Sequence, residues 1–258
     1  MTRRELLSMA FLGLAAARQL SAQNAQNAKK KGDALPSTAT EARLVARPGA
    51  PMEEAKPGLH ELGLGGRRDG VLYVPKGYKA DRPAPLAVML HGAGGSARRA
   101  LGPFQNLADE AGLILLATDS RGQTWDVLEG GYGPDIAFLD RALEHTFARC
   151  AVDPKRIAAE GFSDGASYAL SIGITNGDLF SHVIALSPGF MVPKDQRGKP
   201  KIYVSHGTGD QVLSIDRCSR KLVPQLKNAG YDVLYREFDG PHTVPPDIAK
   251  EAVKWFAG

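Results

Sequence analysis

The stretch Gly161-Phe162-Ser163-Asp164-Gly165 decides the fold, because it sets one serine between two glycines at a change of secondary structure. The apolar run 156–160 before it indicates a buried strand, and segment 164–175 after it has apolar residues at helical spacing. A strand that passes into a helix through Gly-x-Ser-x-Gly needs a very tight turn, and the two glycines let strand and helix approach each other closely. The sequence therefore predicts that Ser163 is held on a strained turn.

Outward from this turn, apolar runs alternate with amphipathic segments along the chain. The predicted strands are 59–64, 70–74, 86–90, 113–118, 156–160, 182–186, 201–205 and 233–238, and the predicted helices are 98–111, 134–149, 164–175, 214–229 and 245–256. Repeated strand-helix-strand units predict an α/β fold with a doubly wound, mostly parallel sheet that starts with antiparallel strands. In such sheets ligands bind beyond the carboxyl ends of the strands, so the residues directly after each strand are the functional candidates.

Two polar residues follow later predicted strands. Asp210 ends the motif His-Gly-Thr-Gly-Asp, and His242 ends Gly-Pro-His. Taken singly, an aspartate that caps its own turn and a surface histidine are the competing interpretations. The chain order Ser163, Asp210, His242 is that of a catalytic triad, in which the histidine is the general base for the serine and the aspartate orients it. Asp239 lies too close to His242 along the chain to fold back on it with this geometry.

The motif His91-Gly92-Ala93-Gly94-Gly95-Ser96 follows the predicted strand 86–90. A serine that attacks a carbonyl needs two backbone N–H groups aimed at the negative charge that develops on the oxygen. We predict that these belong to Ala93, with Gly94 as the next candidate, and to Asp164, the residue after the serine, where the start of the helix adds its positive end. His91 precedes the serine and is expected to brace the loop.

The loop 120–133 contains two aromatic residues, Trp125 and Tyr132. They are candidates for the wall of a substrate pocket, and the alternative is that they pin the loop to the core.

The motifs HGAGGS, GFSDGAS, HGTGD and GPHTV together resemble those of the α/β-hydrolase superfamily, in its phospholipase/carboxylesterase and polyhydroxybutyrate-depolymerase-like esterases. The resemblance covers residues 59–258. It implies Ser163, Asp210 and His242 as triad, Ala93 and Asp164 as oxyanion donors, and a small-molecule ester as substrate, with no metal and no organic cofactor. The segment 186–201 is too short for a helical lid domain, which favours soluble or short-chain esters. A peptidase or thioesterase with the same triad, and an inactive fold kept for binding, are the alternatives.

The N-terminus has the layout of an export signal. Thr2-Arg3-Arg4 precedes an uncharged apolar stretch that ends at Ala17, which is too short to span a bilayer as a stable helix. We predict a signal peptide over 1–22, with the paired arginines compatible with either a twin-arginine or an ordinary secretory route, and therefore an exported protein without stable membrane insertion after cleavage. Residues 23–57 are predicted as a flexible tether and 58–258 as the catalytic domain.

The charge balance excludes a nucleic-acid partner. The formal net charge of +4 falls to +2 without residues 1–22, which hold 3 of the 32 cations and one of the 28 anions. Part of that excess is the run of lysines at 29–31, so no basic face is indicated. Cys150 and Cys218 are the only cysteines, and because they fall beside different strands we expect two separate buried thiols. The sequence does not determine the oligomeric state.

Overall fold

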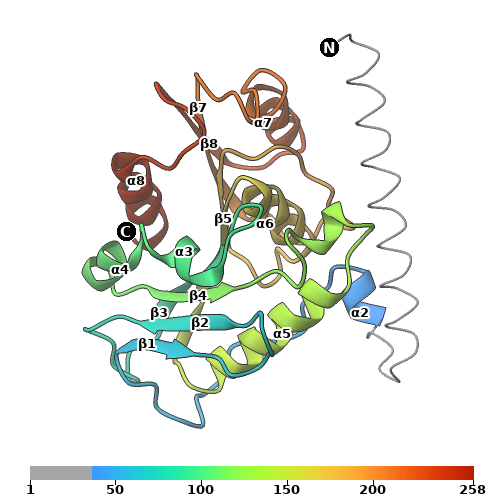
Figure 1. The fold of residues 1–258 in the computed structure, drawn as a ribbon. Helices are drawn as coiled ribbons and strands as arrows, with labels where there is room; N and C mark the ends of the chain where they lie inside the picture. The colour runs from blue at the N-terminus through green and yellow to red at the C-terminus, as the bar shows by residue number, and fades with distance from the viewer. Residues whose placement is uncertain (1–36) are drawn as a thin grey trace.

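The computed structural model describes residues 37–258, which contain one eight-stranded sheet in the order β1-β2-β4-β3-β5-β6-β7-β8 (Figure 1). The strand β2 runs antiparallel to both of its neighbours, and all other neighbouring strands are parallel. The predicted mostly parallel sheet with an antiparallel start is confirmed. Its strands are β1 (Gly58–Glu61), β2 (Gly70–Val74), β3 (Ala84–Leu90), β4 (Ile114–Thr118), β5 (Val152–Phe162), β6 (His182–Leu186), β7 (Lys201–Gly207) and β8 (Val233–Phe238).

Helices cover both faces of this sheet (Figure 1). One face packs against α5 (Pro134–Phe147), α6 (Asp164–Thr175) and α7 (Ser219–Asn228), and the other against α3 (Ala97–Leu101), α4 (Gln105–Ala111) and α8 (Pro246–Ala257). Because the central strands are covered on both sides, every residue of β2, β3 and β4 is buried. This doubly wound arrangement brings the carboxyl ends of the parallel strands to one edge.

Two predicted helices differ from those observed. The helix expected over 98–111 is divided at Gly102-Pro103 into α3 and α4, because proline has no N–H to donate to a helical hydrogen bond. The helix expected from Ser214 begins at Ser219, since residues 214–218 form a separate turn that leaves the backbone of Cys218 outside the helical region.

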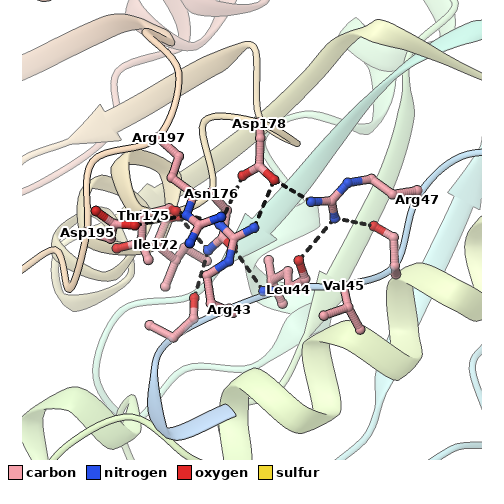
Figure 2. Close-up of polar contacts among 12 residues, drawn as sticks. Arg43, Leu44, Val45, Arg47, Ile172, Thr175, Asn176, Asp178, Asp195 and Arg197 are labelled. Atoms are coloured by element: carbon pink, nitrogen blue, oxygen red, sulfur yellow. Dashed lines mark hydrogen bonds and ion pairs between the residues drawn. The ribbon is translucent and has the colours of Figure 1, made fainter. Parts of the chain in front are cut away.

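The segment before β1 is packed where it is described, which corrects the predicted tether over residues 37–57. A short helix, α2 (Ser37–Thr40), leads into a strip that lies against the end of α6. As Figure 2 shows, the Arg43 guanidinium donates to the carbonyl oxygen of Thr175 at 2.7 Å and to both carboxylate oxygens of Asp178. The Leu44 N–H donates to the Asn176 side-chain oxygen at 2.9 Å. Partners more than 130 residues away in the chain therefore fix this strip, which its polar composition did not reveal.

The predicted signal peptide over 1–22 and the remainder of the tether, 23–36, lie outside the described residues. Within the described part, both cysteines are free and buried, which confirms the expected separate thiols. None of the helices in residues 37–258 combines the length and apolar character that crossing a bilayer requires.

Candidate active site

Ser163 lies on the predicted strained turn between β5 and α6. Its backbone has φ 58° and ψ −120°, a conformation that L-residues rarely adopt. The flanking glycines are required by close packing: a Cβ at Gly161 would lie 2.2 Å from the carbonyl oxygen of Gly165, and a Cβ at Gly165 would lie 1.9 Å from that of Leu90. The serine N–H donates to the Leu186 oxygen at 2.9 Å, which ties the turn to β6. The sequence motif thus reflects steric requirements on both sides of the turn.

The three residues of the predicted triad meet at this turn. The Nε2 atom of His242 lies 2.8 Å from the Ser163 Oγ, and its Nδ1 lies 2.5 Å from the Asp210 Oδ2. Ser163 is 9% exposed, so its hydroxyl is at the edge of the protein interior. Asp239 is exposed and has no side-chain partner among the described residues. The structure therefore pairs the histidine with Asp210 and not with its neighbour in sequence.

The Asp210 carboxylate is held in place by several donors. Its Oδ1 accepts hydrogen bonds from the backbone N–H groups of Val212 and Leu213, at 2.9 and 2.8 Å. Burial by itself would raise the pKa of Asp210, but the N–H of Leu213 and the imidazole of His242 hold that pKa below its ordinary value. The carboxylate is thus ionised and rigidly oriented at neutral pH.

A second histidine contacts the same carboxylate, and the sequence reasoning assigned it no role. The Nε2 of His206 lies 3.2 Å from the Asp210 Oδ2 and 2.7 Å from the Leu213 carbonyl oxygen, and its Nδ1 lies 2.6 Å from the Ser219 Oγ. Burial lowers the pKa of His206, so the ring is neutral. With its proton on Nε2 it supports the loop that carries Asp210. The sequence feature that could have pointed to His206 is its place at the start of the motif His-Gly-Thr-Gly-Asp, which ends at Asp210.

The predicted oxyanion donors flank the serine. Ala93 is exposed on the loop after β3, and its N–H has no acceptor among the described residues. The N–H of Gly94, by contrast, donates to the Gln123 oxygen at 2.8 Å. Asp164 is the first residue of α6, where a helix leaves backbone N–H groups without partners within the helix. The Asp164 side chain accepts a hydrogen bond from the Thr124 hydroxyl at 2.7 Å. The direction of the Asp164 backbone N–H is set by its place at the start of α6.

His91 braces this loop, as expected. The ring is 3% exposed; its Nδ1 lies 2.7 Å from the Gly92 oxygen and its Nε2 accepts from the Ser120 N–H at 3.0 Å. This pattern requires the proton on Nδ1, and burial lowers the pKa of His91, so the ring is neutral. Arg68, which the sequence reasoning did not single out, lies with Nη2 3.3 Å from the His91 Nε2 and 3.4 Å from the Gly95 oxygen.

The two loop aromatics pack against the protein interior. Trp125 is 1% exposed, stacks on the Tyr168 ring at 4.8 Å and donates its indole N–H to the His91 oxygen. Tyr132 is 7% exposed and donates its hydroxyl to the Val192 oxygen at 2.8 Å. The prediction of a substrate contact is wrong for Trp125, because its ring lies inside the core. Both residues pin the loop, which was the alternative interpretation.

Within residues 37–258 no three His, Cys, Asp or Glu side chains gather in a way that would hold a metal ion.

Comparison with known proteins agrees with this fold. No protein-family model matches the chain. Feruloyl esterase C of Emericella nidulans is 29% identical over 157 residues, a match that spans 58% of this chain and 57% of that protein. The chain thus covers little more than half the length of this curated relative.

Solved structures of esterases share the fold. Esterase PE8 superposes with a TM-score of 0.61 at 22% identity, over 74% of this chain and 98% of that one. A ferulic acid esterase of Anaeromyces mucronatus, solved in complex with ferulic acid, superposes with a TM-score of 0.61 at 17% identity, over 86% of this chain and 94% of that one. The chain has the α/β-hydrolase fold, and its sequence is similar to proteins named as esterases.

Proposed function

We propose that the protein hydrolyses carboxylic esters with Ser163 as nucleophile. The observation that carries this proposal is the continuous hydrogen-bonded chain from the Ser163 Oγ through both nitrogens of His242 to Asp210, at 2.8 and 2.5 Å. The distance of 2.8 Å between the His242 Nε2 and the Ser163 Oγ is within the range in which a base removes a proton from the nucleophile. Similarity to proteins named as esterases supports the same reaction.

The proposed reaction proceeds through an acyl-enzyme. The Ser163 oxygen attacks the ester carbonyl carbon while Nε2 of His242 takes its proton, and the N–H groups of Ala93 and Asp164 bind the resulting oxyanion. His242 returns the proton to the departing alcohol oxygen as the C–O bond breaks. Water then attacks the acyl carbonyl carbon while His242 takes its proton, and His242 returns that proton to the Ser163 oxygen as the carboxylic acid is released. Asp210 holds Nδ1–H of the imidazole and stabilises the positive charge it carries in each transition state.

A fixed strap borders the site where other hydrolases could carry a lid. Residues 187–198 contain no helix. Three hydroxyls in successive turns of α6 accept hydrogen bonds from the backbone of this strap: Ser167 from Gly189, Ser171 from Val192 and Thr175 from Lys194. Since a strap bonded at three points does not need to open, we propose that the enzyme takes dissolved esters. The names of its relatives make esters of aromatic acids the first series to try.

We also propose that the protein is exported, on the basis of the charged and apolar pattern of residues 1–22.

Labelling with a fluorophosphonate probe tests the nucleophile directly. We expect labelling of the wild type and none of Ser163→Ala, with ester hydrolysis lost in the same variant. A folded wild-type protein that does not react would indicate an inactive fold kept for binding. Turnover of thioesters or peptides at rates above those of oxygen esters would point to the thioesterase or peptidase alternative.

A further inference from the structure

A buried carboxyl group without a partner lies next to the proposed site. Glu160 is 3% exposed, and its side chain has no hydrogen bond or ion pair with any residue of the described chain. Buried polar side chains are nearly always paired, because a carboxyl that leaves water without a new partner loses several kcal/mol of hydration. Strand β5 places this glutamate three residues before Ser163. The exception therefore calls for a functional explanation.

Glu160 faces a cavity of about 240 Å³. The walls are mostly apolar, and the residues that line them include Ala100, Pro103, Phe104, Phe162 and Val244. A cavity of roughly 150 Å³ is enough to hold benzene, so this one has room for a six-membered ring with a substituent. The cavity is therefore large enough for a ligand group.

The cavity borders the reacting groups on two sides. Gly92 and Ala93, in the loop that carries an oxyanion donor, form part of its wall, and so does Phe162, whose ring centroid lies 4.7 Å from that of His242. A Cβ on Gly92 would lie 3.3 Å from the Cβ of Ser163. A group bound in the cavity is therefore within reach of an ester carbonyl at the serine.

The chemistry of the walls selects the kind of group. Burial raises the pKa of Glu160 well above its ordinary value, which favours the neutral carboxyl, a group with one donor and one acceptor. His91 also lines the cavity, but both of its ring nitrogens already have partners. Arg99 is exposed at the rim and disfavours the entry of a cation. An ammonium would in addition find no second acceptor side chain to replace its water.

We infer that this cavity is a specificity pocket in which Glu160 hydrogen-bonds the hydroxyl group of an otherwise apolar part of the ester. A hydroxyl matches the carboxyl because each supplies one donor and one acceptor. The inference rests on the proposed esterase function for its role in catalysis. The group belongs to either the acyl or the alcohol side of the ester, and both are tested.

Two pairs of esters that differ by one hydroxyl give the kinetic test. The acyl pair is methyl 3-(4-hydroxyphenyl)propanoate and methyl 3-phenylpropanoate, and the alcohol pair is 2-(4-hydroxyphenyl)ethyl acetate and 2-phenylethyl acetate. We expect the wild type to favour the hydroxylated member of one pair by about tenfold in kcat/KM, the scale of one well-made hydrogen bond. The pair that shows the preference identifies the side of the ester.

Variants of Glu160 assign the preference to the carboxyl. Glu160→Leu should reduce the ratio to one or below, whereas Glu160→Gln, which keeps a donor and an acceptor, should retain most of it. The matched control is Glu144→Leu, because Glu144 is exposed on α5 and far from the cavity wall; its ratio should equal that of the wild type. Equal rates for both members of both pairs in the wild type, or a preference that survives Glu160→Leu, would overturn the inference.

A binding measurement separates the pocket from the reaction. In Ser163→Ala protein, titration calorimetry should show 4-methylphenol binding more tightly than toluene by about tenfold, with the difference lost when Glu160→Leu is added. If esters are not hydrolysed and the fluorophosphonate does not react, the proposed function fails while this measurement still decides the pocket. Labelled, active protein without any preference for 4-methylphenol would retain the function and refute the pocket.

Discussion

The substitution Asp210→Asn gives the sharpest test of the proposed triad. In the structure, Oδ1 accepts two backbone N–H groups and Oδ2 faces the Nδ1 of His242 at 2.5 Å. An asparagine has one oxygen, so it satisfies only one of these two sides. Leaving the N–H groups of Val212 and Leu213 without this part-buried acceptor would cost up to about 1–3 kcal/mol each. The oxygen should therefore stay with Val212 and Leu213, and the NH2 group should face the imidazole.

This orientation reverses the hydrogen bond to His242. The amide donates to Nδ1, which places the ring proton on Nε2, and a protonated Nε2 cannot accept the proton of Ser163. The charge that stabilises the imidazolium is lost as well. The same substitution in a serine protease triad lowers kcat by about 10⁴, and we expect a fall of between about 10² and 10⁴ here. Because the backbone bonds persist, stability should change by no more than about 1 kcal/mol, or roughly 2–4 °C in the unfolding midpoint.

The measurement compares kcat for one activated ester, together with thermal unfolding, in two variants. Asp239→Asn is the control, since Asp239 is exposed and lies three residues before His242. A large loss of kcat in Asp239→Asn with a mild one in Asp210→Asn would mean that the orienting acid is misassigned. Equal, small losses in both would remove the aspartate from the mechanism.

Four further outcomes follow from the same structure. Gly165→Ala should prevent folding or lower the free energy of unfolding by more than about 3 kcal/mol, because its Cβ would lie 1.9 Å from the backbone of β3. A soluble variant whose denaturant titration shows wild-type stability would contradict the close packing. Burial and the buried carboxylate of Asp126 raise the pKa of Asp135 to about 7. The stability that Asp135 contributes is therefore full below the pKa of an unfolded aspartate, about 3.9, and is lost as the pH rises through about 7. The unfolding midpoint should fall between about pH 3.9 and about pH 7 in the wild type, and Asp135→Asn should make this fall smaller. A chain that starts at residue 58 should be at least about 2 kcal/mol less stable to urea than one that starts at residue 37, since the strip over 38–47 buries apolar side chains. Mass spectrometry of exported protein should find the chain starting after Ala22, and an intact N-terminus would contradict the signal peptide.

The sequence predicted the framework of this site because its constraints are local. Glycines at 161 and 165 are steric requirements of one turn, and the strands before Ser163, Asp210 and His242 show themselves as apolar runs. Since parallel strands end at a common edge, the order of motifs along the chain was sufficient to bring three distant residues together.

The sequence was less informative about whether a loop side chain faces the core or the solvent. Trp125 lies in a loop, and loop composition does not tell whether an aromatic ring faces a ligand or the core. The strip around Arg43 has a tether's composition, yet it is fixed by Asp178 and Asn176, which come more than 130 residues later.

By itself, then, the sequence determined the fold class, the strained serine turn and the identity of the three residues that meet there, because each depends on backbone sterics and on the period of apolar residues. Only the tertiary structure decided which aspartate oxygen faces the imidazole, that His206 and Arg68 support the two loops, and that Glu160 is left without a partner beside an apolar cavity. Those features depend on groups from separate strands meeting at distances of a few ångströms, and no local pattern in the chain encodes such distances.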